Sequence, residues 1–205
     1  MVNLIHQMVG AATFHAAMVE ITIGSLTLSV ICTIMCLQYS FKSPIDRFNI
    51  SENKLLTMDR AALIGAILGT IMMPFSIMTG TLSVAGDPTG SILLYNKFVY
   101  SGLALVFWVS YVIGRVRLGP NLWKNKKLNI LQVSTAILAF FMTITIASIG
   151  GKLVRNESLL DLIPFWFPIN STIVIHPLLS IVIILIGICS IITVSKFGEI
   201  IEYED

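Results

Sequence analysis

Five long apolar runs constrain this chain more than any other feature, and they cover about residues 9–38, 61–84, 92–114, 129–149 and 173–195. Each run meets the length of about 20 apolar residues that a transmembrane helix requires. In lipid the backbone must satisfy its own hydrogen bonds, so only helices or a closed barrel can span the membrane. Barrel strands would alternate apolar and polar residues over about ten positions, and these runs do not. The runs predict an all-α integral membrane bundle of five transmembrane helices, forming one domain over residues 1–205.

The composition excludes a soluble protein. Only 12% of the residues are charged and 56% are hydrophobic, whereas a soluble domain has about 25% charged residues. The net charge of +2 is too small to indicate a nucleic-acid partner. The lipid bilayer is therefore the expected surrounding of the chain.

The distribution of Lys and Arg predicts the orientation. With five spans, the connections 39–60 and 115–128 lie on the same side as the C-terminus. This side carries ten of the 13 basic residues, namely Lys42, Arg47, Lys54, Arg60, Arg115, Arg117, Lys124, Lys126, Lys127 and Lys196. Cytoplasmic loops are rich in Lys and Arg, so we expect a multi-pass protein of the plasma membrane with its N-terminus outside and its C-terminus in the cytoplasm.

The connection before the fifth run has an aromatic cluster, Phe165-Trp166-Phe167, between two prolines. Aromatic side chains are favoured at the boundary between lipid and water. We therefore expect residues 156–171 to form a segment that lies in the outer membrane interface.

Two histidines begin helices that both run from outside to inside, His15 in the first run and His176 in the fifth. They are expected at similar depth near the outer face. Two such imidazoles could ligate a b-type haem or bind copper or zinc, and His6 could join a metal site. The alternative is that both are interfacial residues with an apolar body and a hydrated tip.

Glu20 is an acidic residue inside the first apolar run. It lies five residues, about 7 Å along a helix, beyond His15 and about 140° around the helix from it. A carboxylate at this depth is costly unless it is paired or protonated, and Lys97 in the third run is a candidate partner. A structural ion pair, a neutral carboxylic acid, and a proton relay or quinol-site base are the open alternatives.

The second apolar run contains a close-packing motif, Gly65-x-x-x-Gly69. Such a motif allows a second helix to approach closely, and that helix could belong to this chain or to another. Pro74 follows within the same run and is expected to kink it.

Two stretches resemble an uncharacterised prokaryotic family of small predicted membrane proteins. The family opens its first helix with a His-Pro-Leu-Leu-Val-His-Phe-Pro-like stretch, and residues 15–22 here read His-Ala-Ala-Met-Val-Glu-Ile-Thr. His15 and Val19 match, while Glu20 replaces the second histidine and both prolines are missing. The family ends its fourth helix with Gly-Gly-x-Leu-Val, which residues 150–154 match.

Two shorter strings accompany this resemblance, which covers about residues 15–155. Thr79-Gly80 fits a Thr-Gly of the family pattern, and His-Pro-Leu-Leu recurs at residues 176–179 on the fifth run. The resemblance implies a four-helix membrane core of a kind associated with redox or respiratory modules. It establishes no activity, and the missing second histidine removes a family-type histidine pair from the first helix.

Three functions are open at this point. The first is an integral subunit of a larger membrane redox or respiratory-type complex, with a b-type haem or a metal such as copper near His15 and His176. The second is an accessory subunit without chemistry, and the third is a small proton-coupled transporter that uses Glu20. In the first two, the chain assembles with other membrane subunits and is a non-catalytic or electron-transfer component rather than a stand-alone enzyme.

Overall fold

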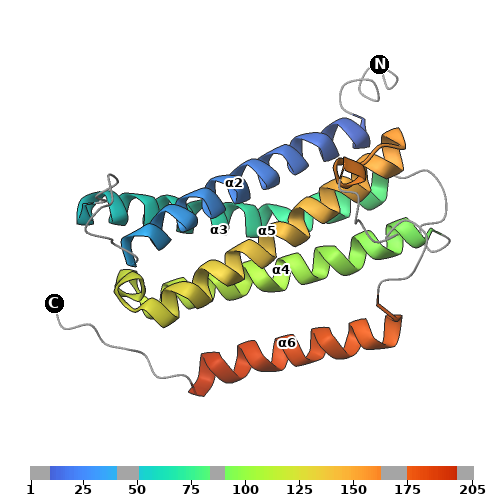
Figure 1. Cartoon of the computed structure of the whole chain (residues 1–205). Helices are drawn as coiled ribbons and strands as arrows, with labels where there is room; N and C mark the ends of the chain where they lie inside the picture. Colours follow the sequence, from blue (N-terminus) through green and yellow to red (C-terminus); the bar gives the residue numbers. More distant parts are fainter. Residues whose placement is uncertain (1–9, 41–50, 84–90, 163–174, 198–205) are drawn as a thin grey trace, which may run out of the picture.

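The computed structural model describes residues 10–40, 51–83, 91–162 and 175–197. In this part of the chain the secondary structure is entirely helical (Figure 1). The long helices are α2 (Ala11–Ser40), α3 (Glu52–Ser83), α4 (Ile92–Leu118), α5 (Lys126–Arg155) and α6 (Pro177–Phe197), and two short 3-10 helices are η2 (Pro120–Lys124) and η3 (Leu159–Leu162).

Four helices, α2 to α5, are long and apolar enough to cross a membrane among the residues described. The prediction of a helical multi-pass membrane protein is confirmed to this extent. The fifth apolar run does form a helix, α6, of 21 residues. Whether α6 crosses the membrane and which way the chain is oriented stay predictions.

The helices extend further into the polar connections than the apolar runs indicate. Helix α3 begins at Glu52 rather than near residue 61, so Asp59 lies within a helix and not in a loop. Helix α5 begins at Lys126, because the Asn125 side chain accepts hydrogen bonds from the backbone N–H groups of the first turn. An apolar run stops at the first polar residues, but the helix continues through these residues until a capping side chain ends it.

Consecutive helices run in opposite directions (Figure 1). Helix α2 packs along α3 and also contacts α5, while α4 contacts both α3 and α5. Helix α6 lies on the outer side of α4, across the bundle from α2 (Figure 1). Its attachment to α4 includes Tyr95, whose hydroxyl donates to the carbonyl oxygen of Ile175 at 2.6 Å.

The close-packing motif of α3 meets α2 of the same chain. A Cβ atom on Gly65 would stand 2.7 Å from the backbone oxygen of Ser25, and one on Gly69 would stand 2.4 Å from the Leu26 side chain. The two glycines thus permit the closest approach of α2 and α3, which answers the question left open by the sequence. Pro74 lies inside α3, which continues as one helix to Ser83.

The centre of the bundle contains two aromatic side chains of α4 that are fully buried, Trp108 and Tyr111. Their rings meet edge to face with centroids 5.7 Å apart, an arrangement that aromatic pairs favour. The Trp108 indole donates to the Thr143 hydroxyl of α5 at 3.2 Å. This hydrogen bond pairs a polar atom of α4 with one of α5 inside the core.

Candidate functional site

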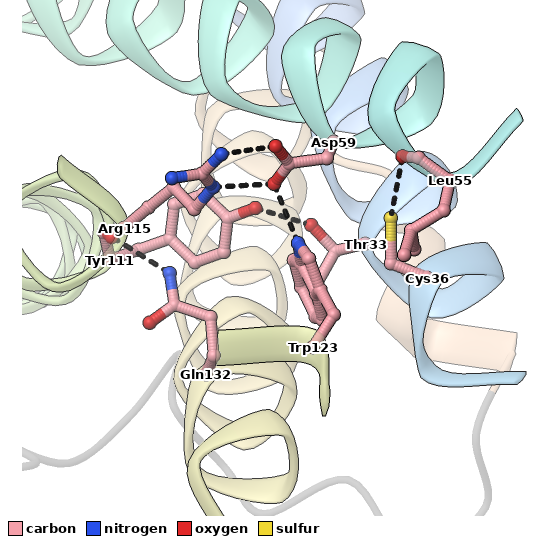
Figure 2. A network of polar contacts seen from close by, with 8 residues as sticks. All are labelled: Thr33, Cys36, Leu55, Asp59, Tyr111, Arg115, Trp123 and Gln132. Atoms are coloured by element: carbon pink, nitrogen blue, oxygen red, sulfur yellow. Dashed lines mark hydrogen bonds and ion pairs between the residues drawn. The ribbon is translucent and has the colours of Figure 1, made fainter. Parts of the chain in front are cut away.

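A buried ion pair lies at the end of the bundle where η2 connects α4 to α5. Asp59 of α3 is 1% exposed and Arg115 of α4 is 6% exposed. Both Nε and Nη2 of Arg115 donate to the Asp59 carboxylate, and the Trp123 indole of η2 donates to Asp59 Oδ1 at 2.6 Å (Figure 2). We call Asp59, Arg115 and Trp123 the Asp59 clamp.

The turn after α4 places Trp123 in the clamp. Gly119 has φ 63° and ψ −177°, a conformation that is essentially restricted to glycine. Its N–H bonds to the Arg115 carbonyl and Pro120 then begins η2. The chain therefore reverses within a few residues and returns the buried Trp123 to α3.

Further hydrogen bonds connect the surroundings of the clamp to the other two helices (Figure 2). The hydroxyls of Tyr111 and Thr33 of α2 are 2.6 Å apart. Gln132 of α5 donates through Nε2 to the Tyr111 carbonyl at 2.8 Å. Four helices and η2 are therefore joined at this end, and both carboxylate oxygens of Asp59 are occupied by donors. The arrangement suits a structural ion pair rather than a free acid or base.

The Asp59 clamp was not predicted from the sequence, although the residue spacing along α3 is consistent with it. Buried residues recur along α3 at spacings of three and four, at Leu55, Asp59, Ala62, Ala66 and Gly69. This is the spacing of one helix face. If this face is extended toward the N-terminus of α3, it places Asp59 in the protein interior, where a charged partner is required.

The opposite end of the bundle holds His15 of α2, which is half-buried. Its Nδ1 lies 3.1 Å from the Thr79 hydroxyl of α3. The Thr79 hydroxyl also lies 2.8 Å from the carbonyl oxygen of Phe75 in its own helix. If the hydroxyl donates to that carbonyl, neutral His15 donates through Nδ1 and keeps its lone pair on Nε2. The ring rests against Gly80, where a Cβ would stand 2.9 Å from Cε1.

Lys97 of α4 and Glu20 of α2 do not form an ion pair. Lys97 is half-buried, and its Nζ lies 3.5 Å from the position that a Cβ on Gly150 of α5 would take. The Glu20 side chain is exposed on α2. The ion pairs among the described residues are Arg115–Asp59, Lys124–Glu52 and Lys152–Asp161.

The two candidate haem ligands are not brought together. His176 is exposed immediately before α6, and its Nδ1 accepts from the backbone N–H of Leu178 at 3.3 Å. His15 packs against α3, and α6 lies on the far side of the bundle from α2 (Figure 1). Two axial ligands must face the same iron, so this pair does not fit a haem. His6 lies outside the described residues, and within them no group of three or more His, Cys, Asp or Glu could hold a metal ion.

The described part of the predicted interfacial segment, residues 156–162, contains η3. Asp161 of η3 accepts from Lys152 Nζ at 3.0 Å and from the Ser158 N–H at 3.0 Å. The hydrogen bond from Lys152 holds the pKa of the Asp161 carboxyl below its usual range. Leu159 and Leu162 are exposed, but the aromatic cluster lies outside the described residues.

Comparison of the chain with models of known families, with curated proteins and with solved structures found no match. The resemblance to a family of small membrane proteins therefore stays an expectation from the sequence.

Proposed function

We propose that the chain is an integral membrane subunit that assembles with other membrane proteins through the exposed face of α2. The observation that carries the proposal is Glu20, an acidic side chain exposed on a membrane-spanning helix. A subunit could have chemistry of its own or serve only as an accessory protein, and the separation of His15 from α6 (Figure 1) favours the accessory role.

The depth of Glu20 makes its exposure costly. Helix α2 has 30 residues, about 45 Å at 1.5 Å per residue, whereas the hydrocarbon core of a bilayer is about 30 Å thick. If α2 is centred in the bilayer, Glu20 lies about 6 Å inside the hydrocarbon. An ionised side chain costs about 3 kcal/mol at the centre of a span on insertion scales, and Glu20, about 9 Å from that centre, carries a smaller part of this cost. A partner that pairs with Glu20 would remove this cost.

Small residues surround Glu20 on the same exposed face. Ala16, Ala17 and Gly24 are all exposed, and a Cβ added to Gly24 would meet nothing within 4 Å. Small residues let two helix backbones approach closely in lipid. The face therefore suits a transmembrane helix of another protein that places a basic or hydrogen-bonding side chain opposite Glu20.

Photo-crosslinking in native membranes tests this proposal. A photoreactive residue at Gly24 should give a discrete adduct with another polypeptide, and the same residue at Ile137, on the exposed surface of α5, should give none. Glu20→Gln should weaken the Gly24 adduct. Adducts with lipid alone at both positions would contradict the proposal. A pH-dependent flux in vesicles that Glu20→Gln abolishes would instead support the transporter.

We infer the orientation from the basic residues and take α6 as a fifth span. At 1.5 Å per residue its 21 residues cover about 32 Å, close to the thickness of the hydrocarbon core. The expected topology puts the Asp59 clamp end in the cytoplasm of a prokaryotic cell. In a Cys189→Ser background, an impermeant maleimide should label Glu157→Cys in intact cells and should leave Lys127→Cys unlabelled. The reverse pattern would overturn the orientation.

A further inference from the structure

Exposed lysines gather at the end of the bundle where η2 connects α4 to α5. Lys124 of η2 and Lys126 and Lys127 of α5 follow one another closely along the chain, and all three are exposed. Lys124 Nζ lies 3.2 Å from Glu52 Oε1 in the first turn of α3. Lys54, two residues after Glu52 and also exposed, is therefore at the same end. We call Lys54, Lys124, Lys126 and Lys127 the basic surface.

The fold holds the basic surface in place. Trp123 of η2 is buried and donates to Asp59, while Lys124 beside it is exposed. The Asn125 side chain then accepts from two backbone N–H groups in the first turn of α5. The lysines thus stand next to anchored residues, and their positions follow from the Asp59 clamp and from the cap of α5.

Lys126 and Lys127 oppose the electrostatics of their own helix. They are the first two residues of α5, whose first turn has no acidic residue. The beginning of a helix carries partial positive charge, so a cation there is unfavourable and an anion is favourable. Lys152 and Arg155 lie instead in the last turn of α5, where cations are favourable. The first two lysines therefore destabilise α5, and an external anion would offset this effect.

The basic surface lies at the level of the lipid headgroups. Helix α5 has 30 residues and α3 has 32, which correspond to about 45 and 48 Å. A hydrocarbon core is about 30 Å thick, so each helix, if centred, extends about 7–9 Å beyond the core at either end. Lys54, Lys126 and Lys127 are all among the first three residues of these helices, which places them outside the hydrocarbon.

We propose that the basic surface binds the anionic headgroups of the bilayer leaflet that it faces. The negative potential of an anionic leaflet attracts lysines close to its surface. A leaflet presents many phosphate groups in one plane, so the four ammonium groups need not converge on one ligand. This surface involves neither Glu20 nor the partner proposed for α2, and it does not depend on the orientation of the chain.

Thermal unfolding in nanodiscs tests the proposal. The full chain is compared in phosphatidylcholine and in an equal mixture of phosphatidylcholine and phosphatidylglycerol. The melting temperature should be higher in the mixture, because a ligand that binds the folded state stabilises it. The gain should nearly vanish at about 1 M salt, where the Debye length is about 3 Å. No gain at low salt, or a gain that salt leaves unchanged, would overturn the proposal.

Matched variants of α5 connect the gain to the basic surface. Gln and Lys have similar helix propensities, so Lys126→Gln/Lys127→Gln mainly removes charge. In phosphatidylcholine this double variant should melt above the unchanged chain, because it relieves the conflict with the helix dipole. It should lose about half of the gain from phosphatidylglycerol, because it removes two of the four lysines.

A lysine at the other end of α5 is the control. Lys152→Gln should melt below the unchanged chain in phosphatidylcholine, because it loses the contact with Asp161. It should keep the gain from phosphatidylglycerol, because the charge of Lys152 is already paired. Equal gains for Lys152→Gln and Lys126→Gln/Lys127→Gln would overturn the proposal.

The acidic C-terminal tail is a competing occupant of the basic surface. It contains Glu199, Glu202, Glu204 and Asp205. If the tail covers the lysines, phosphatidylglycerol should raise the melting temperature only after the three glutamates are replaced by Gln. That result would also overturn the proposal, whereas a gain in the unchanged chain supports it.

Discussion

The two ends of the bundle differ in whether their charged side chains are paired within the chain. At one end, Asp59 and Arg115 are both buried and pair with each other, and Trp123 adds a third contact. At the other end, Lys97 and Arg155 make no ion pair with a described carboxylate, and Glu20 is exposed on α2. The first set of charges is satisfied by the fold itself, so it stabilises the bundle. The second set is left for molecules that the chain meets in the membrane.

The largest effect is expected from breaking the Asp59 clamp on one side only. Arg115→Met leaves the buried Asp59 without its counter-charge, which should lower the free energy of unfolding by about 3–5 kcal/mol. The double variant Asp59→Leu/Arg115→Met should recover much of this loss, because it removes both charges. Chemical unfolding of the purified protein measures both values. Lys124→Met is the control, because the exposed Lys124–Glu52 pair should contribute at most about 1 kcal/mol.

A somewhat smaller effect is expected where α2 and α3 touch. In Gly65→Ala the new Cβ would meet the Ser25 backbone oxygen at 2.7 Å, so the helices must separate, at a cost of about 1–3 kcal/mol. Gly102→Ala in α4 is the matched control, because its Cβ would meet nothing within 4 Å. The control should be neutral or stabilising by up to about 1 kcal/mol, because alanine favours a helix over glycine. Equal melting temperatures for the two variants would show that α2 does not pack on Gly65 in this way.

Trp123→Phe should have a moderate effect. It removes the indole N–H that donates to Asp59 but leaves both contacts from Arg115. We expect a loss of about 1–2 kcal/mol in unfolding free energy. The loss should shrink when Asp59 is already Leu, which a double-mutant cycle measures. Equal losses in both backgrounds would mean that Trp123 acts only through packing.

The smallest effect concerns the exposed Lys152–Asp161 pair. Because Lys152 lowers the pKa of Asp161, this contact is fully formed above the usual pKa of an aspartate and is lost as the pH falls through the lowered pKa. An NMR titration of the Asp161 carboxyl should therefore find a midpoint below the usual range. Lys152→Met should move the midpoint upward, and an unchanged midpoint would exclude the contact in solution.

Much of the membrane architecture was predictable from the apolar runs. Helices α2 to α5 lie where these runs predict spans, because lipid requires both their length and their helical hydrogen bonding. The first turns of α3 were not predictable in this way, because their polar residues resemble a loop. For this reason Asp59 was assigned to a connection rather than to the core.

The sequence identified candidate residues more readily than the residues that they contact in the structure. Glu20 and Lys97 stand out as charges in apolar runs, but their pairing depends on how each helix is rotated about its axis. That rotation follows from packing details such as the contact of Gly65 with Ser25. Likewise, the first and fifth apolar runs were both expected to begin outside, so His15 and His176 were predicted at a similar depth. The sequence did not indicate that the helices that carry them lie on opposite sides of the bundle.

The central claim is that the fold satisfies Asp59 internally and leaves Glu20 to a partner. The most direct test compares the unfolding free energies of the purified chain with Asp59→Asn and with Glu20→Gln, in the same lipid–detergent mixture. We expect a loss of several kcal/mol for Asp59→Asn and an unchanged or higher stability for Glu20→Gln. If Glu20→Gln destabilises the isolated chain as much as Asp59→Asn does, Glu20 is satisfied within the chain and the claim is wrong.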